Sequence, residues 1–191
     1  DAARRPAGRP ERRGTGRAVS LDTSERGGTA GRRPFSLSER IHVTEETVWK
    51  GRFLEAVVEN DWEYVRRPGG MGAAVILAVT ETAEIVLVEQ YRVPLGTSCL
   101  ELPAGLVGDA GPEEVLTAAR RELEEETGFH AETVEDLGMF TSSPGMTSEH
   151  FTLVRATGLA RIGPGGGVDG EAITVHCVPL RTLPDFIAEK R

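Results

Sequence analysis

The sequence predicts an α/β sandwich in which a mixed sheet packs against one central helix and carries an N-terminal β-hairpin extension. Two observations support this fold class. Short apolar or alternating stretches, typical of strands, precede and follow a single segment whose apolar residues recur at helical spacing. Breaks rich in Gly and Pro separate these stretches. The length of 191 residues suits one domain with a terminal tail.

Residues 1–40 differ in composition from the rest of the chain. Nine arginines against four acidic residues in the segment 1–33 give it a charge of about +5, which leaves about −13 for the remainder of a chain whose total is −8. Segments rich in Arg and Gly are usually disordered, so we expect a disordered tail. We favour a translated leader, because the chain does not begin with Met; contact with nucleic acid or an acidic surface is the alternative. The acidic body argues against nucleic-acid binding and suits a protein that holds phosphates through cations.

Hydropathy and cysteine usage bear on the cellular compartment. No apolar run approaches the roughly 18 residues of a membrane-spanning helix, and no signal-peptide pattern is present. We therefore expect no membrane association. Cys99 and Cys177 lie in apolar, strand-like stretches, and we interpret them as buried small residues rather than a disulfide or a metal pair. A cytoplasmic location follows.

The predicted strands begin with a hairpin. Residues 53–60 and 62–67 alternate apolar and polar side chains, with Asn60 near the turn. Residues 73–79, AAVILAV, are continuously apolar and predict a strand buried on both faces. Further strands are predicted at residues 84–92, in the stretch 98–105 before it becomes a loop, and at residues 150–159 and 171–180.

The central helix is predicted at residues 112–127. Pro112 suits the first helical position, where its missing N–H costs nothing, and Gly128 can adopt the left-handed conformation just beyond the end. The apolar positions that define the repeat are Val115, Leu116, Ala119 and Leu123. A glycine-rich loop, expected to be mobile, follows at residues 161–170, and a closing helix begins in residues 180–191.

Four glutamates fall within five consecutive positions near the end of this helix. Glu124 points to solvent, where an acidic residue needs no explanation. Glu126 falls inside the apolar stripe, and Glu122 and Glu125 flank it. Burying unpaired carboxylates is costly, so a positive group is expected beside them. Carboxylates spaced i, i+3 and i+4 can ligate a hard divalent cation, whereas the alternative, a solvated acidic face, does not explain Glu126.

The run from Gly105 to Phe129 resembles the signature box of the Nudix hydrolases, which reads G, five residues, E, seven residues, then R-E-U-x-E-E-x-G-U, with U a bulky apolar residue. The matching residues are Glu113, Arg121, Glu122, Leu123, Glu125, Glu126, Gly128 and Phe129. Seven residues rather than five separate Gly105 from Glu113, which predicts a longer loop before the helix. The resemblance implies a Nudix-type α/β/α sandwich over residues 71–191, with residues 41–70 as N-terminal strands that can form a dimer-swapped hairpin.

The resemblance also implies a reaction, namely hydrolysis of a nucleoside diphosphate linked to another moiety with Mg²⁺, or Mn²⁺, as cofactor. It implies that the cation is held by Glu122, Glu125 and Glu126 with the Ala104 carbonyl, that Glu122 and Glu125 take part in catalysis, and that Arg121 orients a carboxylate. Cations suit this chemistry because they reverse the local charge and polarise phosphorus.

Three stretches outside the box resemble those of ADP-ribose pyrophosphatases: EQYRVP (89–94), ELPAG (101–105) and SSPGMTSE (142–149). This resemblance implies cleavage of ADP-ribose to AMP and ribose 5-phosphate. Arg92 is expected to hold a phosphate, with a rim salt bridge as the alternative. Glu101 is expected to accept a hydrogen bond from a ribose hydroxyl or to help hold the metal, with a purely structural role as the alternative.

The same resemblance implies roles in binding the rest of the substrate. Trp62, assisted by Arg67, is expected to stack on adenine, and in that subfamily such an aromatic often crosses a homodimer; a Trp packed in the core is the alternative. Pro144 and Met146 should shape the wall against the terminal ribose.

The resemblance to ADP-ribose pyrophosphatases also implies that a carboxylate from the glycine-rich loop acts as general base. We favour Glu171 over Asp169, and a solvated loop acid is the alternative. His130, His150 and His176 show no partner pattern and are interpreted as ordinary surface or strand residues.

Two rival functions stay open. One is a Nudix hydrolase of another sugar nucleotide, a dinucleotide or an oxidised nucleoside triphosphate. The other is a non-catalytic ADP-ribose-binding sensor domain. A non-catalytic domain is expected to lose the box glutamates, and here all of them from Glu122 onward are present.

Overall fold

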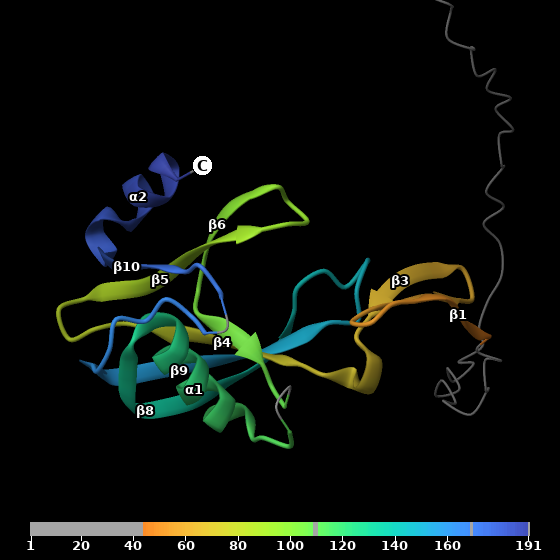
Figure 1. The fold of residues 1–191 in the computed structure, drawn as a ribbon, viewed down its shortest axis with the longest axis horizontal. Coiled ribbons are helices and arrows are strands. Elements are labelled where there is room, and N and C mark those ends of the chain that lie inside the picture. The colour runs from red at the N-terminus through yellow and green to blue at the C-terminus, as the bar shows by residue number, and fades with distance from the viewer. Residues whose placement is uncertain (1–43, 109–110, 169, 191) are drawn as a thin grey trace, which may run out of the picture. The chain divides into compact units, whose positions relative to one another are not determined.

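The computed structural model describes residues 44–108, 111–168 and 170–190, so the predicted tail lies outside the described residues. The strands are β1 (Glu45–Lys50), β2 (Glu55–Glu59), β3 (Trp62–Arg66), β4 (Ala73–Ala78), β5 (Glu84–Arg92), β6 (Thr97–Glu101), β7 (Ala104–Leu106), β8 (Phe129–Thr141), β9 (His150–Arg161) and β10 (Thr174–Pro179). The helices are α1 (Val115–Thr127) and α2 (Leu183–Glu189), and two 3-10 turns are η1 (Pro68–Gly70) and η2 (Leu180–Thr182). Figure 1 shows these elements and confirms the α/β class.

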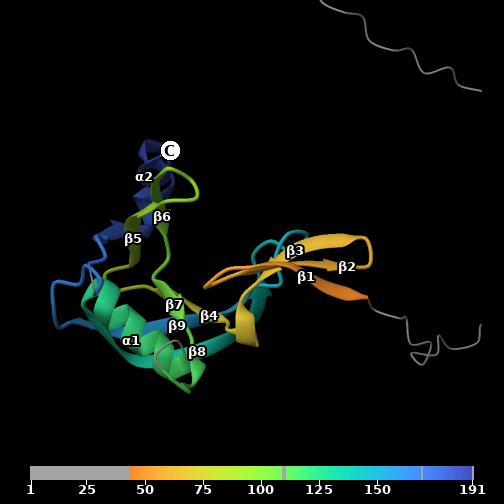
Figure 2. The same cartoon turned by 45° about the vertical axis from the view of Figure 1, so that its right-hand side comes forward.

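The strands form three sheets. The antiparallel sheet β1-β2-β3 is the N-terminal extension, and a second antiparallel sheet has the order β10-β5-β6. The third sheet is mixed and has the order β7-β4-β9-β8, in which β4 and β9 are parallel. Helix α1 covers the mixed sheet and α2 packs beside β10 of the second sheet, whereas the N-terminal sheet extends to one side, away from both helices (Figures 1 and 2).

The core lies between α1 and the mixed sheet. Ala119 and Leu123 of α1 pack there with Ile76 of β4 and Val154 of β9, and all four are fully buried. Burying one aliphatic side chain of this size contributes about 1.5–3 kcal/mol, so this packing fixes the position of α1 on the sheet. The glutamates on the same helix are thereby fixed as well.

Helix α1 begins at Val115, three residues later than predicted. Glu114 is extended and precedes the first helical residue, so the placement of Pro112 at the first helical position was wrong. The guanidinium of Arg121 binds the carboxylate of Glu113, which precedes the helix, at 3.2 Å. Gly128 ends the helix in the left-handed conformation (φ 71°), as predicted.

Strand β4 is buried on one face and not on both. Ala74, Ile76 and Ala78 are fully buried, whereas Ala73 and Val75 line a cavity on the opposite face. The run is apolar throughout because the residues that line the cavity, on the face opposite the core, are apolar as well. The prediction therefore took both faces as buried. Strand β8 was not predicted, β1 was covered only by the general expectation of N-terminal strands at residues 41–70, and β7 lies where the stretch 98–105 was expected to become a loop. All of β1 is exposed, and the pairing register of β8 is broken between Asp136 and Met139, so neither shows a clean alternation.

The two cysteines are free thiols. Cys99 is half-buried as part of β6, but Cys177 is exposed, so the prediction of burial was wrong for Cys177. Its strand, β10, lies at the edge of its sheet, which leaves one side open. Neither described helix is long and apolar enough to cross a membrane.

Candidate active site

Glu126 is the most enclosed of the helix carboxylates. Its side chain emerges among the apolar residues of α1, and the residue is only 5% exposed. Its Oε2 accepts a hydrogen bond from the N–H of Ala104 at 3.0 Å. Burial raises the pKa of Glu126 to about 7, and repulsion from Glu122 and Glu171 acts in the same direction. The predicted placement inside the apolar stripe is confirmed, and the position favours a nearby cation.

Gly105 allows Glu122 to approach strand β7. A Cβ at Gly105 would lie 2.0 Å from Oε1 of Glu122, closer than any real contact, so a larger residue would displace the carboxylate from this position. Because β7 also supplies the N–H that binds Glu126, one short strand positions both carboxylates.

Arg121 connects three carboxylates on the other side of the helix. It donates to Glu122 at 2.9 Å, to Glu125 at 3.0 Å and to Glu113 at 3.2 Å. These partners, Glu113 first, raise the pKa of the Arg121 guanidinium above its usual value. The longer loop before α1 therefore still brings Glu113 to Arg121. These contacts are the ones that the expected orienting role of Arg121 requires.

Glu122 and Glu126 face a cavity of about 550 Å³ that is also lined by the cationic side chains of arginines. Its polar lining consists of Arg67, Gln90, Arg92, Glu122, Glu126, Ser142, Glu149, His150 and Glu171, with Ala104 and Gly105 at one wall. The structure thus brings together six residues singled out from the sequence: Arg67, Arg92, Ala104, Glu122, Glu126 and Glu171. Among the described residues, Glu125 does not line the cavity, because it turns toward Arg121.

Both cavity arginines are paired with carboxylates. Arg92 donates to Glu101 through Nε at 2.8 Å and Nη2 at 2.5 Å, so the rim salt bridge considered above is present. Arg67 donates to Glu149 through Nε at 2.8 Å. A guanidinium carries five N–H donors, so each arginine keeps donors for a phosphate. Glu149 and His150 were not selected from the sequence, although Glu149 ends the SSPGMTSE stretch and could have been.

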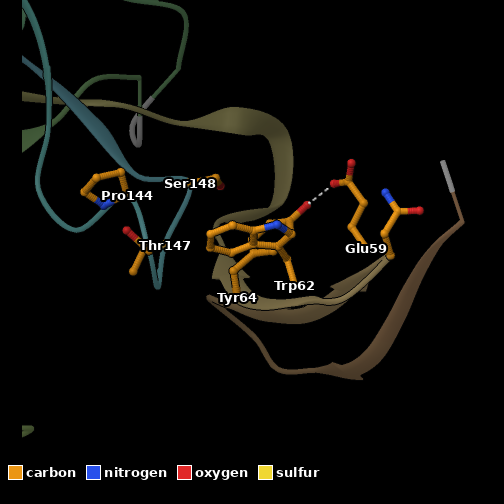
Figure 3. A pocket seen from close by; sticks show the side chains of 8 residues that line it. Glu59, Trp62, Tyr64, Pro144, Thr147 and Ser148 are labelled. Carbon is orange, nitrogen blue, oxygen red and sulfur yellow. Dashed lines mark hydrogen bonds between the residues drawn. The ribbon is translucent and has the colours of Figure 1, made fainter. Parts of the chain in front are cut away.

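Trp62 lies in a second hollow of about 460 Å³, between the hairpin and the loop that follows β8. Figure 3 shows Trp62 and Tyr64 on the hairpin side, facing Pro144, Thr147 and Ser148 on the loop. Trp62 is 62% exposed, so it is not a core residue. Of the described residues, Trp62 and Pro144 line this hollow and not the Glu126 cavity.

The loop at residues 142–149 forms a wall between the two hollows. Ser142 and Glu149 line the Glu126 cavity, whereas Pro144 and Ser148 line the Trp62 hollow. Met146 is 70% exposed, and its carbonyl accepts from the Val65 N–H at 3.0 Å. This bond attaches the loop to the hairpin.

Of the remaining acids and histidines named in the sequence analysis, some line the cavity and others form ion pairs away from it. Glu171 lines the cavity, and its Oε2 accepts from the Val168 N–H at 3.2 Å; Asp169 lies outside the described residues. His130 pairs with Glu124 at 2.7 Å and His176 with Glu89 at 2.9 Å. These two histidines belong to local pairs, whereas His150 lines the cavity.

The donor set suits a hard divalent cation. Within the described part of the chain, no three His, Cys, Asp or Glu side chains gather closely enough to form a complete metal site. Mg²⁺ in phosphate-processing sites commonly uses one or two carboxylates and completes its shell with water and substrate phosphates. Glu122 and Glu126, beside Ala104, provide that arrangement.

Comparison with known proteins agrees with this geometry. The NUDIX domain family matches residues 70–190. The chain is 36% identical over 165 residues to a "Methanol dehydrogenase activator" of Bacillus methanolicus, covering 81% of this chain and 86% of that protein. It is 40% identical over 131 residues to an "ADP-ribose pyrophosphatase" of Mycobacterium tuberculosis, covering 63% of this chain and 61% of that protein.

A further relative and a solved structure agree. An "ADP-ribose pyrophosphatase" of Bacillus subtilis is 36% identical over 123 residues, covering 60% of this chain and 63% of that protein. The chain therefore spans somewhat less than two thirds of the length of both pyrophosphatases. A crystal structure of an "ADP compounds hydrolase" superposes with a TM-score of 0.62 at 27% identity, covering 76% of this chain and 82% of that chain. Nudix hydrolases generally use divalent metal ions. The matched domain, and the box residues that meet at the cavity, show that this chain belongs to the Nudix hydrolase family as a pyrophosphohydrolase.

Proposed function

We propose that this enzyme hydrolyses ADP-ribose to AMP and ribose 5-phosphate in a Mg²⁺-dependent reaction. The observation that carries the proposal is a single cavity that combines the carboxylates Glu122 and Glu126 with the guanidinium groups of Arg67 and Arg92. In the reaction, the oxygen of a water molecule forms a bond to one phosphorus atom and the bridging P–O bond breaks. The two monophosphates then leave.

The metal would be held by Glu122 and Glu126 with the Ala104 carbonyl. Glu125 would also ligate the metal if its carboxylate left Arg121 and bound the cation instead. When bound, Mg²⁺ supplies neutralisation of the diphosphate charge and polarisation of phosphorus. Without a cation, the carboxylates would repel a diphosphate. The enclosed position of Glu126 supports this assignment.

The other residues of the chain bind the substrate and move the proton. Arg67 and Arg92 donate to phosphate oxygens, and Glu101 keeps the Arg92 fork in position. Glu171 accepts the proton of the attacking water. We expect Glu171→Gln to lower kcat by about two orders of magnitude or more with little change in substrate binding.

Trp62 provides a flat apolar face for the adenine, and Pro144 and Met146 belong to the loop that would enclose the rest of the substrate. Trp62 lines a different hollow from the cavity that contains Glu126. This arrangement supports an active unit in which the hairpin of one subunit contributes Trp62 to the substrate site of its partner. The exposed aromatics of the hairpin segment support the same homodimer, since Trp49 is 58% and Phe53 63% exposed. Sedimentation should give twice the mass of the chain, and activity should fall on dilution below the dimer dissociation constant.

The free thiols Cys99 and Cys177 support a cytoplasmic setting.

A second candidate is action on a dinucleotide, or activation of a dehydrogenase. The relative named as a methanol dehydrogenase activator supports only the activation of a dehydrogenase, because that alignment covers 81% of this chain and those with the two pyrophosphatases 60% and 63%. The test is kcat/KM for ADP-ribose, ADP-glucose, NADH and a nucleoside triphosphate, each with Mg²⁺ and with Mn²⁺. A preference of about tenfold or more for any of the last three, about 1.4 kcal/mol in the barrier, would overturn the ADP-ribose assignment.

A further inference from the structure

The glycine-rich segment 162–168, called the strap below, is bonded to the C-terminal end of α1. The N–H of Gly166 donates to the carbonyl of Glu126 at 2.8 Å, and that of Gly167 donates to the carbonyl of Glu125 at 3.1 Å. The N–H of Ile162 donates to the carbonyl of Gly128 at 2.8 Å. The last carbonyls of a helix have no partner within the helix. Here the strap satisfies two of them, next to the cavity glutamates, although its composition predicts a mobile loop.

Gly165 is the strap glycine at which an added Cβ would meet the backbone of the end of α1. A Cβ there would lie 2.4 Å from the carbonyl carbon of Thr127 and 2.7 Å from the carbonyl oxygen of Glu126, and the backbone has a φ of +68°. These are backbone atoms, which cannot move aside as the end of a side chain can. Gly163 offers the contrast, since a Cβ there would meet nothing within 4 Å and its φ lies outside the left-handed region.

Arg161 fastens the strap from its other side. Its Nε donates to the carbonyl of Gly163 at 3.2 Å and its Nη2 donates to that of Pro164 at 3.1 Å. The guanidinium also lies over the ring of Phe129, 5.4 Å from the centroid. Arg161 is exposed, so its replacement removes these bonds without opening the core.

The strap also holds Glu171. The N–H of Glu171 donates to the carbonyl of Val168 at 3.0 Å, and the carboxylate accepts from the N–H of Val168 at 3.2 Å. The N–H of Ile173 donates to the carbonyl of Gly166 at 3.3 Å. Both sides of Glu171 are therefore tied to the strap, and the strap is tied to the helix that carries Glu122 and Glu126.

We infer that Gly165 is a positioning residue for Glu171. Its close fit against the end of α1 sets the distance between the Glu171 carboxylate and the carboxylates of Glu122 and Glu126 across the cavity. Proton transfer to a carboxylate requires hydrogen-bond reach, so a displacement of the strap lowers kcat through Glu171. The inference rests on the proposed function in that Glu171 accepts the proton.

The test is a double-mutant cycle on the full-length chain. Gly165→Ala should lower kcat by about tenfold or more with KM changed less than about twofold. Gly163→Ala, the matched control in the same strap, should leave both constants within about twofold. In the Glu171→Gln background, Gly165→Ala should change kcat by less than about twofold, because interacting residues are not additive.

Equal losses from Gly165→Ala in both backgrounds would overturn the inference, since the substitution would then act on the fold and not through Glu171. An unchanged kcat for Glu171→Gln would overturn it too, while leaving the hydrolase assignment intact. If the wild type instead prefers a substrate other than ADP-ribose, only the proposed substrate fails, and the cycle is run with the preferred one.

A second variant covers the case in which Gly165→Ala does not fold. Arg161→Ala should lower kcat by about threefold to tenfold with an unchanged far-UV spectrum, and Arg161→Lys should recover part of that loss because an ammonium can still donate to one carbonyl. The same Arg161→Ala change should have little effect in the Glu171→Gln background. An unchanged kcat for Arg161→Ala would overturn the role of the strap.

Discussion

The carboxylate of Glu122 lies against the α-carbon of Gly105, so that a Cβ at Gly105 would lie 1.9 Å from the carboxylate carbon. The obstacle is the end of a flexible side chain and not backbone. Gly105→Ala should therefore cost little stability, because Glu122 can rotate away. It should cost activity, because the rotated carboxylate leaves its place in the cavity. We expect a loss of about 10-fold to 100-fold in kcat/KM, as for other changes that misorient a metal ligand.

The check is to measure melting temperature and turnover together for Gly105→Ala, with Gly163→Ala as control. A melting temperature within about 2 °C of wild type together with the loss of turnover supports the steric argument. Full activity in Gly105→Ala would mean that Glu122 can serve from another rotamer, or is not a ligand.

Glu126→Gln separates charge from shape at the most enclosed carboxylate. The amide oxygen can still accept from the Ala104 N–H, so the hydrogen bond at 3.0 Å in the wild type is retained. Repulsion from Glu122 and Glu171 is removed, so the metal-free variant should melt at the same temperature as wild type or higher. Turnover should fall by about two orders of magnitude or more, because a neutral amide is a poor ligand for Mg²⁺. Near-normal turnover would refute the metal assignment.

Adding or removing the metal should affect wild type and Glu126→Gln to different extents. Wild type should gain thermal stability on adding Mg²⁺ or Mn²⁺, by about 2.7 kcal/mol at a concentration of 100 times the Kd. Glu126→Gln should gain much less at the same concentration. Differential scanning fluorimetry with EDTA and with a metal series measures both, and equal shifts would show that the stabilising cation binds elsewhere.

Arg121→Lys tests whether one guanidinium organises the box. Arg121 reaches Glu113, Glu122 and Glu125 at distances between 2.9 and 3.2 Å. A lysine has one nitrogen and cannot reach all three, so at least one carboxylate loses its orientation. We expect activity to fall by about 10-fold to 100-fold. Arg120→Lys, which alters the neighbouring arginine bound to the carbonyl of Ala131, is the control and should change activity far less.

Much of the candidate site could be predicted from the spacing of residues that are close together in the sequence. The repeat of apolar residues placed Glu126 inside the stripe of α1, and the left-handed glycine at its end is Gly128, as predicted. Such features depend on residues three or four positions apart, which a sequence displays directly. The start of α1 was mispredicted because the contact between Glu113 and Arg121 spans eight positions.

Features that depend on distant partners could not be predicted. The strap bonds to α1 because β9 returns the chain to the helix end, and no local pattern in the glycine-rich stretch reveals that partner. The pair of Arg67 and Glu149 joins residues 82 positions apart. The division between the Trp62 hollow and the Glu126 cavity arises from the path of one loop, which composition does not specify.

Trp62→Ala tests the stacking role and the proposed assembly together. The exposed indole faces the hollow shared with Pro144 and Thr147, where a flat base would bury apolar area against it (Figure 3). Stacking of this kind is worth about 0.5–1.5 kcal/mol beyond area burial. Because the ring touches no reacting atom, its loss should weaken ground state and transition state equally, so KM should rise about tenfold while kcat changes less than about twofold.

Trp62→Phe is the matched variant, because it keeps a planar ring and should restore most of the affinity. Sedimentation of Trp62→Ala should be recorded at the assay concentration, so that a change in KM is not confused with dissociation of a dimer. An unchanged KM for Trp62→Ala would contradict the stacking role.

A mixed dimer of one Trp62→Ala subunit and one Glu126→Gln subunit reports which subunit supplies the ring. Its only intact cavity belongs to the Trp62→Ala subunit, and its only indole at position 62 belongs to the Glu126→Gln subunit. If the hairpin serves the partner's cavity, the two intact parts combine, and the mixed dimer should show the KM of wild type. If the hairpin instead serves its own cavity, the active cavity lacks its ring, and KM should stay at the raised value of Trp62→Ala, which would refute the exchange of hairpins between subunits.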